Sequence, residues 1–183
     1  MLSARDGGMI RKPAEWIKPL QEEVGDGFLV HRTMPVNPSK GCDPFLLLDH
    51  MGPVNIPPGR RIGVGDHPHR GFETVTVILE GGVEHRDSAG HHGKVFAGGI
   101  QWMTAASGLV HSEFAAQEVV KTGGKVHFIQ LWCNLPKKNK MDPPRYQDLH
   151  AADLPVIDKK SDGTWIRVLA GELEGVRSPI KTH

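Results

Sequence analysis

Cysteine is scarce in this chain, with only Cys42 and Cys133 among 183 residues. Two cysteines so far apart cannot form the set of disulfides that stabilises small secreted domains. We expect a protein of a reducing compartment. Cys42 is predicted to lie in a loop and Cys133 in a strand, where it would be a packing residue. Neither position suggests a catalytic thiol, and no Ser-His-Asp motif or phosphate-binding glycine loop is present.

Long apolar runs are also missing. No stretch approaches the ~20 apolar residues that a membrane-spanning helix requires. The first 16 residues contain no apolar segment typical of a signal peptide. The sequence therefore predicts a soluble cytoplasmic protein, or a nuclear one if the source is eukaryotic, with no membrane partner.

No excess of charge of one sign is present, since 22 basic residues face 21 acidic ones. This balance gives no reason to expect nucleic acid as a partner. The densest basic run lies among prolines and contains Lys137, Lys138, Lys140 and Arg145. A solvated linker is the simpler interpretation of this run, and a nucleic-acid patch is the alternative.

Glycine and proline are abundant, with 22 and 14 residues. Turn signals recur every 8–12 residues or so, which is typical of antiparallel sandwiches and barrels. We predict an all-β fold with an irregular loop at 52–65. The expected strands are 28–34, 44–51, 67–79, 83–86, 94–96, 100–105, 109–114, 126–135 and 165–171.

The chain divides into three predicted parts. Residues 1–135 would form a barrel, and 136–163, rich in proline and charge, would form a linker. Residues 164–183 would hold the first strands of a second, truncated domain. A strand near residue 165 cannot bury its face alone and would need a partner.

Two pairs of side chains point to a metal ion. Alternation along a strand places His67 and His69 on one face, ~7 Å apart, and does the same for His111 and Glu113. If the two strands are neighbours, three imidazoles and a carboxylate meet. This donor set without thiolate suits Fe, Ni, Cu, Mn or Zn. Four ligands leave coordination positions open, as in a catalytic site.

Glu73 is the competing carboxylate. On one continuous strand from 67 to 79, the odd-numbered side chains would face the barrel interior, so Glu73 would share the face of His69. It lies ~13 Å further along, although a bulge at Gly71 could bring it back. We predict Glu113 as the ligand, with Glu73 bonded instead to a hydroxyl or backbone N–H.

The remaining histidines carry weaker signals. His50 follows an apolar run and could face the site. The others are predicted to be surface or strand histidines without a ligand role: His31, His85, His91, His92, His127 and His150.

Residues 67–75 (HPHRGFETV) and 79–81 (LEG) resemble the first cupin motif of the pirin family. Residues 101–105 (QWMTA), followed by Gly108, His111, Ser112 and Glu113, resemble its partner motif. Further similarity lies at 43–47 (DPFLL), 134–136 (NLP) and 143–146 (PPRY). Two positions depart from the family pattern beside the second motif: Gly99, where Asp is usual, and Ala106, where Gly is usual.

The resemblance implies a cupin jelly-roll barrel holding one divalent ion, with Fe(II) expected first, at positions matching His67, His69, His111 and Glu113. Family members have two barrels, whereas this chain ends where the second should begin. We therefore expect a fragment, a truncated product, or a partner half on another chain.

Two functions follow as expectations. The first is an oxygenase of the pirin type that cleaves flavonols such as quercetin with O2, with Glu113 as a catalytic residue that accepts the substrate hydroxyl proton. The second follows eukaryotic pirins, which act as nuclear, iron-dependent modulators of transcription factors. It is a non-enzymatic iron- or redox-responsive regulator that binds another protein. An inactive truncated paralogue is a third.

Overall fold

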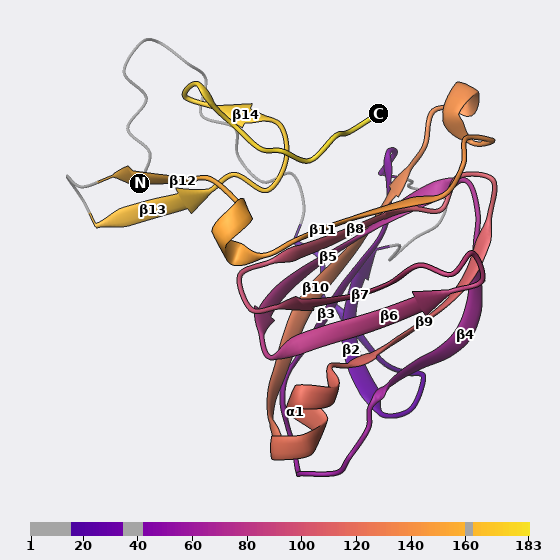
Figure 1. The fold of residues 1–183 in the computed structure, drawn as a ribbon, viewed down its shortest axis with the longest axis vertical. Helices are drawn as coiled ribbons and strands as arrows, with labels where there is room; N and C mark the ends of the chain where they lie inside the picture. Colours follow the sequence, from indigo (N-terminus) through magenta and orange to yellow (C-terminus); the bar gives the residue numbers. More distant parts are fainter. Residues whose placement is uncertain (1–15, 35–41, 160–162) are drawn as a thin grey trace.

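The computed structural model describes residues 16–34, 42–159 and 163–183. Two antiparallel sheets form a barrel, and short hairpins lie beside it near the C-terminus (Figure 1). The larger sheet consists, in spatial order, of β1 (Leu20–Val24), β2 (Phe28–Met34), β3 (Phe45–Ile56), β10 (Gly124–Asn134), β5 (Phe72–Glu80), β8 (Ile100–Thr104) and β11 (Arg145–Leu149). The smaller sheet consists of β4 (Gly63–His69), β9 (Leu109–Ala115), β6 (Gly82–Asp87) and β7 (His92–Phe96).

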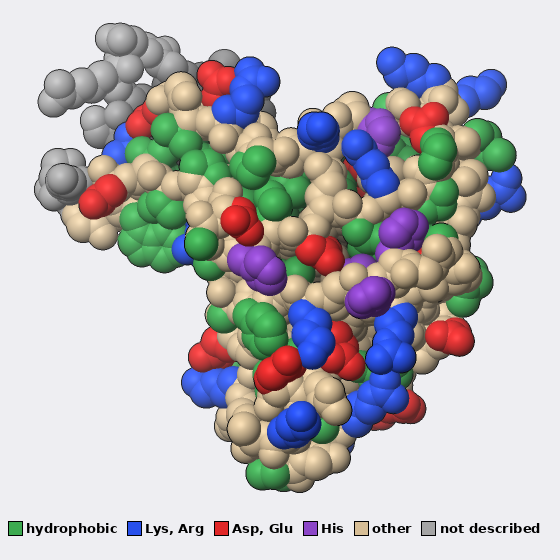
Figure 2. All heavy atoms as spheres, viewed as in Figure 1, with side chains coloured by type: hydrophobic (Ala, Val, Ile, Leu, Met, Phe, Trp, Pro, Cys, Tyr) green, Lys and Arg blue, Asp and Glu red, His purple; other side chains and the backbone are tan. Residues whose placement is uncertain are grey.

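The remaining elements are short. They are helix α1 (Gln117–Thr122), the 3₁₀ turns η2 (Lys137–Asn139) and η3 (Ala151–Asp153), and the hairpins β12 (Val156–Lys159) with β13 (Thr164–Arg167) and β14 (Glu172–Leu173) with β15 (Val176–Arg177). Within the described ranges, no helix has the length and apolar character needed to cross a bilayer. Acidic and basic side chains are interspersed over the face seen in Figure 2.

The core lies between the two sheets. Val30 of the larger sheet and Val95 of the smaller one are fully buried in the same cluster. Phe28 and Phe128 meet edge to face there, with ring centroids 5.3 Å apart. Apolar side chains that alternate along each strand therefore fill one interior, and the predicted all-β barrel is confirmed.

The predicted strand 67–79 is wrong as a single element. β4 ends at His69 and β5 begins at Phe72, and the two belong to different sheets. Gly71 makes the corner with φ of +79°, a conformation that favours glycine. The corner reverses the inward parity, so that Ile78 enters the core while Val75 faces outward. The predicted inward set of odd-numbered residues is therefore wrong beyond Gly71.

The loop predicted at 52–65 is also wrong in part, because β3 continues to Ile56 and β4 begins at Gly63. Gly52 has φ of +80°, and a Cβ there would lie 2.3 Å from the Val126 carbonyl oxygen. The register with β10 shifts beside it, between Val126 and Phe128. Glycine and proline are tolerated in a strand at such an irregularity, so they did not mark a loop here.

Part of the predicted linker belongs to the barrel sheet. β11 lies within residues 136–163, and it pairs with β8 from Arg145↔Thr104 to Leu149↔Ile100. Further along the chain, Leu154 and Ile180 pack on the outer face of this sheet against Trp102. The strand predicted at 165–171 is shorter in the structure, because β13 ends at Arg167, and it pairs with β12. The division of the chain into domains remains a prediction.

Candidate metal centre

Three histidines meet at the edge where β4 and β9 pair. The strands run antiparallel with His67 directly opposite His111, and His69 lies two residues further along β4. One ligand nitrogen from each ring lies within 4.8 Å of those of the other two. The structure therefore brings together the two strands that carried the separate sequence signals.

A backbone carbonyl fixes the form of His67. Its Nδ1 lies 2.7 Å from the Gly65 oxygen, beside a register shift between Val64 and His67. A carbonyl can only accept, so Nδ1 carries the proton and Nε2 keeps a free lone pair. That Nε2 lies 3.1 Å from the Nε2 of His111. The tautomer is the one that binds a metal ion.

The other two imidazoles are buried, with His69 5% and His111 1% exposed. Burial is the main cause that lowers the pKa of each to about 3, and neighbouring imidazoles lower both further. Both rings are therefore neutral at pH 7. A neutral imidazole is the form that donates to a metal ion.

Glu113 is close enough to His69 to influence its charge. Its carboxylate is not among the ligand atoms that all lie within 4.8 Å of one another, which come from the three histidines alone. Its Oε2 accepts a hydrogen bond from Gln130 Nε2 at 3.1 Å. The Trp132 indole N–H donates to Gln130 Oε1, which sets the amide so that its NH2 faces Glu113. The contact with Gln130 holds the carboxylate in place from one side.

The residues fit a divalent cation. Glu113 Oε1 and His69 Nδ1 are buried atoms without a hydrogen-bond partner among the described residues. A buried polar atom without a partner is costly, and a cation would balance the carboxylate. Three imidazoles and one carboxylate form a donor set typical of divalent first-row metals.

Glu73 is not part of this centre. Its carboxylate is 5% exposed and accepts a hydrogen bond from the Thr104 hydroxyl at 2.7 Å. The prediction that it bonds to a hydroxyl is confirmed. The reversal of parity at Gly71 explains its distance from His69, because Glu73 lies on the outward face of β5, as Val75 does.

The other predicted candidates lie elsewhere. The idea that His50 could face the site is wrong, since its Nε2 contacts that of His127 on the outer face of the larger sheet. His91 bonds to Asp87, and His92 is exposed. Cys42 is exposed, whereas Cys133 is half-buried and burial raises the pKa of its thiol to about 11.

Sequence reasoning missed Tyr146. Its hydroxyl lies 3.4 Å from His111 Nδ1, and its ring stacks on His85 with centroids 4.2 Å apart. His85 in turn lies 2.8 Å from Asp148. Burial raises the pKa of Tyr146 above its usual value, so the hydroxyl keeps its proton. The available signal was that Tyr146 is the single tyrosine of the chain, in a segment predicted as linker.

Two aromatic rings were missed as well. Phe72 and Trp132 stack with centroids 4.6 Å apart, and His69 meets each edge-on at 5.1 and 5.0 Å. They come from neighbouring strands of the larger sheet, where the Asn134↔Phe72 and Trp132↔Thr74 pairs set their positions. The histidine cluster therefore borders an aromatic wall.

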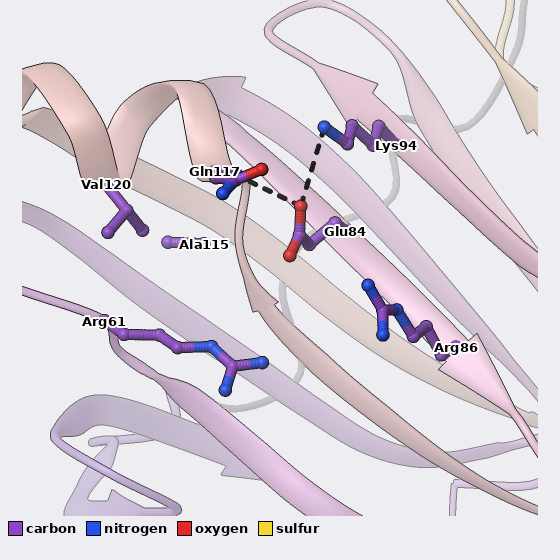
Figure 3. A pocket seen from close by; sticks show the side chains of 7 residues that line it. All are labelled: Arg61, Glu84, Arg86, Lys94, Ala115, Gln117 and Val120. Atoms are coloured by element: carbon purple, nitrogen blue, oxygen red, sulfur yellow. Dashed lines mark hydrogen bonds and ion pairs between the residues drawn. The ribbon is translucent and has the colours of Figure 1, made fainter.

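A hollow of about 340 Å³ lies away from this centre (Figure 3). Its lining includes Arg61, Glu84, Arg86 and Lys94, and none of the three clustered histidines. The Arg61 guanidinium lies 3.4 Å from the centre of the Phe114 ring. This hollow is therefore not lined by the histidines of the candidate metal centre.

A two-sheet antiparallel barrel with histidines converging from adjacent strands defines a protein of the cupin class with a candidate metal site. Residues 27–133 match the family model described as Pirin. The chain belongs to the pirin family.

Relatives and solved structures support this placement. The chain is 48% identical over 162 residues to a Pseudomonas aeruginosa protein whose name describes it provisionally as a quercetin 2,3-dioxygenase, covering 87% of this chain and 57% of that protein. A crystal structure of a quercetin 2,3-dioxygenase from Acinetobacter baumannii superposes with a TM-score of 0.85 at 41% identity, over 91% of this chain and 59% of that one.

A bacterial pirin from Escherichia coli, solved in complex with nickel(II), is 28% identical with a TM-score of 0.58, over 76% of this chain and 59% of that one. The chain therefore spans less than two thirds of the length of each of these three proteins.

Proposed function

We propose that this chain carries the metal centre of an oxygenase that cleaves a flavonol such as quercetin with O2. The observation that carries the proposal is the convergence of His67, His69 and His111 beside a buried Glu113 oxygen that has no partner among the described residues. The names of the Pseudomonas and Acinetobacter relatives support the substrate class.

Three imidazoles would hold the ion, and Glu113 is the proposed fourth ligand. When bound, a divalent ion supplies open coordination positions and, if it is Fe(II), a redox-active centre. We propose Fe(II) as the resident ion, while the nickel complex of the E. coli relative supports divalent metal binding in this fold.

The chain's own side chains perform two further tasks. Gln130 holds Glu113 Oε2 and leaves Oε1 without a partner among the described residues, and Glu113 is the residue that would accept the proton of a flavonol hydroxyl. Phe72 and Trp132 offer a flat apolar surface next to His69. Such a surface suits an aromatic substrate and excludes water from one side of the centre.

Metal analysis combined with oxygen uptake tests the proposal. The chain is loaded anaerobically with Fe(II), desalted and assayed with quercetin in an oxygen electrode. We expect about one iron per chain and flavonol-dependent oxygen uptake. His67→Ala and His111→Ala should lose both, while His92→Ala, which changes an exposed histidine of β7, should keep both.

One result would overturn the oxygenase proposal. A chain that holds a full equivalent of iron and consumes no oxygen with any flavonol tested is not a flavonol oxygenase in this form. Iron-dependent capture of a protein partner under the same conditions would then favour the regulatory function.

A further inference from the structure

Three histidines form a row on the outer face of the larger sheet. His31 of β2 lies directly opposite His50 of β3, and His127 follows on the adjacent β10. The strand neighbours Val30, Met51 and Phe128 point into the core. Because side chains alternate along a strand, the row faces away from the interior and is separate from the centre at β4 and β9.

Two of the rings approach closely. His50 Nε2 lies 2.7 Å from His127 Nε2, with ring centroids 5.0 Å apart. At that distance one Nε2 carries a proton and the other accepts it, so the two atoms point into the same gap between the rings, and a metal ion there would displace that proton. Glu80 lies 3.7 Å from His127 Nδ1 on the far side of the ring. A carboxylate there favours the proton on Nδ1 and leaves Nε2 as a donor to a metal ion.

His31 flanks the pair. Its ring centroid lies 6.2 Å from that of His50, and its Nδ1 is buried with no partner among the described residues. Its Nε2 lies 3.0 Å from the Gln21 amide nitrogen, which can only donate. His31 Nε2 therefore accepts from Gln21, and among the described residues the ligand atoms of His31, His50 and His127 do not all lie within 4.8 Å of one another.

A hydrogen bond between His50 and His127 explains why these two rings are in contact. It does not explain why a third imidazole, that of His31, lies next to them. All three rings are half-exposed in the middle of a sheet, where an ion can enter from solvent. Burial, followed by the charges of His127 and His31, lowers the pKa of His50, which keeps this ring neutral.

We propose that His50 and His127 form a second divalent-metal site, a two-histidine site that His31 borders. Imidazole ligands without thiolate select borderline transition ions such as Zn²⁺, Ni²⁺ or Cu²⁺. Because the site is open on its outer side, water or a side chain of another molecule takes the remaining positions. This second site stands independently of the proposed oxygenase function.

Equilibrium dialysis against Zn²⁺ with elemental analysis tests the second site on the whole chain. We expect two zinc ions per chain. His50→Gln and His127→Gln should each remove one of the two, seen as at least a tenfold (order-of-magnitude) weaker second binding step. His67→Ala should remove the other zinc ion, and the control His92→Gln should leave both.

Two outcomes would overturn the second site. One is a single zinc ion per wild-type chain that is lost in His67→Ala and retained in His50→Gln and His127→Gln. The other is two ions whose binding is unchanged by His50→Gln and His127→Gln. If a variant fails to fold, as judged by circular dichroism, the wild-type chain can still be used to test the second site. Crystals soaked in Zn²⁺ must then show an anomalous peak between His50 and His127, and no peak there refutes the site.

Discussion

At the scale of single residues, Gln130 decides how Glu113 is presented. One amide connects three side chains: it donates to Glu113 and to the Thr76 hydroxyl, and accepts from the Trp132 indole. Each contact removes one orientation that the amide or the carboxylate could otherwise adopt. The position of Glu113 therefore depends on residues that are neither ligands nor neighbours in sequence.

Replacing Gln130 by Leu tests this role. The change removes the donor to Glu113 and leaves the Trp132 N–H unpaired, so we expect metal affinity to fall by about 10- to 100-fold. The free energy of unfolding should fall by about 1–3 kcal/mol. Competition titration with a chromophoric chelator and urea denaturation give the two quantities.

Gln101→Leu is the matched control, because Gln101 is buried on β8 and neither amide atom has a partner among the described residues. It should leave metal affinity unchanged. Equal losses in the two variants would show that Gln130 acts through packing alone.

Cysteine reactivity offers a second test at this scale. Burial, and then Glu73, raises the pKa of Cys133 to about 11, so very little thiolate exists at pH 8. Exposed Cys42 should therefore react with iodoacetamide at least about tenfold faster than Cys133, since only the thiolate attacks. The Cys133 rate should rise with pH up to about 11.

Peptide mapping by mass spectrometry measures both rates, and labelling in urea provides the unfolded reference, in which the rates converge. Faster labelling of Cys133 than of Cys42 in the folded chain would contradict the assigned burial.

At the scale of elements, the corner between β4 and β5 directs His69 and Glu73 to different environments. Gly71 has φ of +79°, and its amide bonds to the Ala106 carbonyl at 2.8 Å while its carbonyl accepts from Lys140 Nζ at 2.7 Å. The corner is thus held from two sides. It transfers the chain from the sheet that carries the histidines to the sheet that carries the aromatic wall.

Gly71→Ala should lower the free energy of unfolding by about 1–2 kcal/mol, the cost of a left-handed conformation for an L-residue. A steric clash would not cause this loss of stability, because the nearest atom to a new Cβ is Lys140 Nζ at 3.5 Å. Urea denaturation measures the change.

Gly65→Ala is the control, since Gly65 has no left-handed φ and no atom within 4 Å of a new Cβ. It should change stability by less than about 0.5 kcal/mol. A neutral Gly71→Ala would argue against the left-handed corner.

At the scale of the whole molecule, the C-terminal segment completes the outer face of the larger sheet. Leu154 and Ile180 are 3% and 6% exposed and cluster with Val75, Ile100 and Trp102. The Arg145 guanidinium also donates to the Lys181 carbonyl at 3.0 Å. The segment beyond residue 150 therefore covers apolar surface that the barrel strands would otherwise expose.

Leu154→Ala and Ile180→Ala should each cost about 2–5 kcal/mol, as buried aliphatic truncations do. Leu173→Ala, at a position 41% exposed, should cost less than about 0.5 kcal/mol. Thermal and urea unfolding of the three variants measure these losses in the free energy of unfolding. Three equally small effects would show that the segment does not pack on the sheet in solution.

The sequence alone determined which candidate ligands lie on the same face of one strand. The two-residue spacing of His67 with His69, and of His111 with Glu113, sets each pair on one face because strand alternation is a local property of the backbone. Turn spacing likewise determined the all-β class. Neither inference required knowledge of which strands become neighbours.

Tertiary structure decided which residues from distant segments contact each pair. The left-handed corner at Gly71 reversed the parity of β5, and the pairing of β11 with β8 brought Tyr146 to His111. Gln130 reaches Glu113 from a strand 17 residues away. Such contacts depend on the packing of distant segments, which alternation within one strand does not specify.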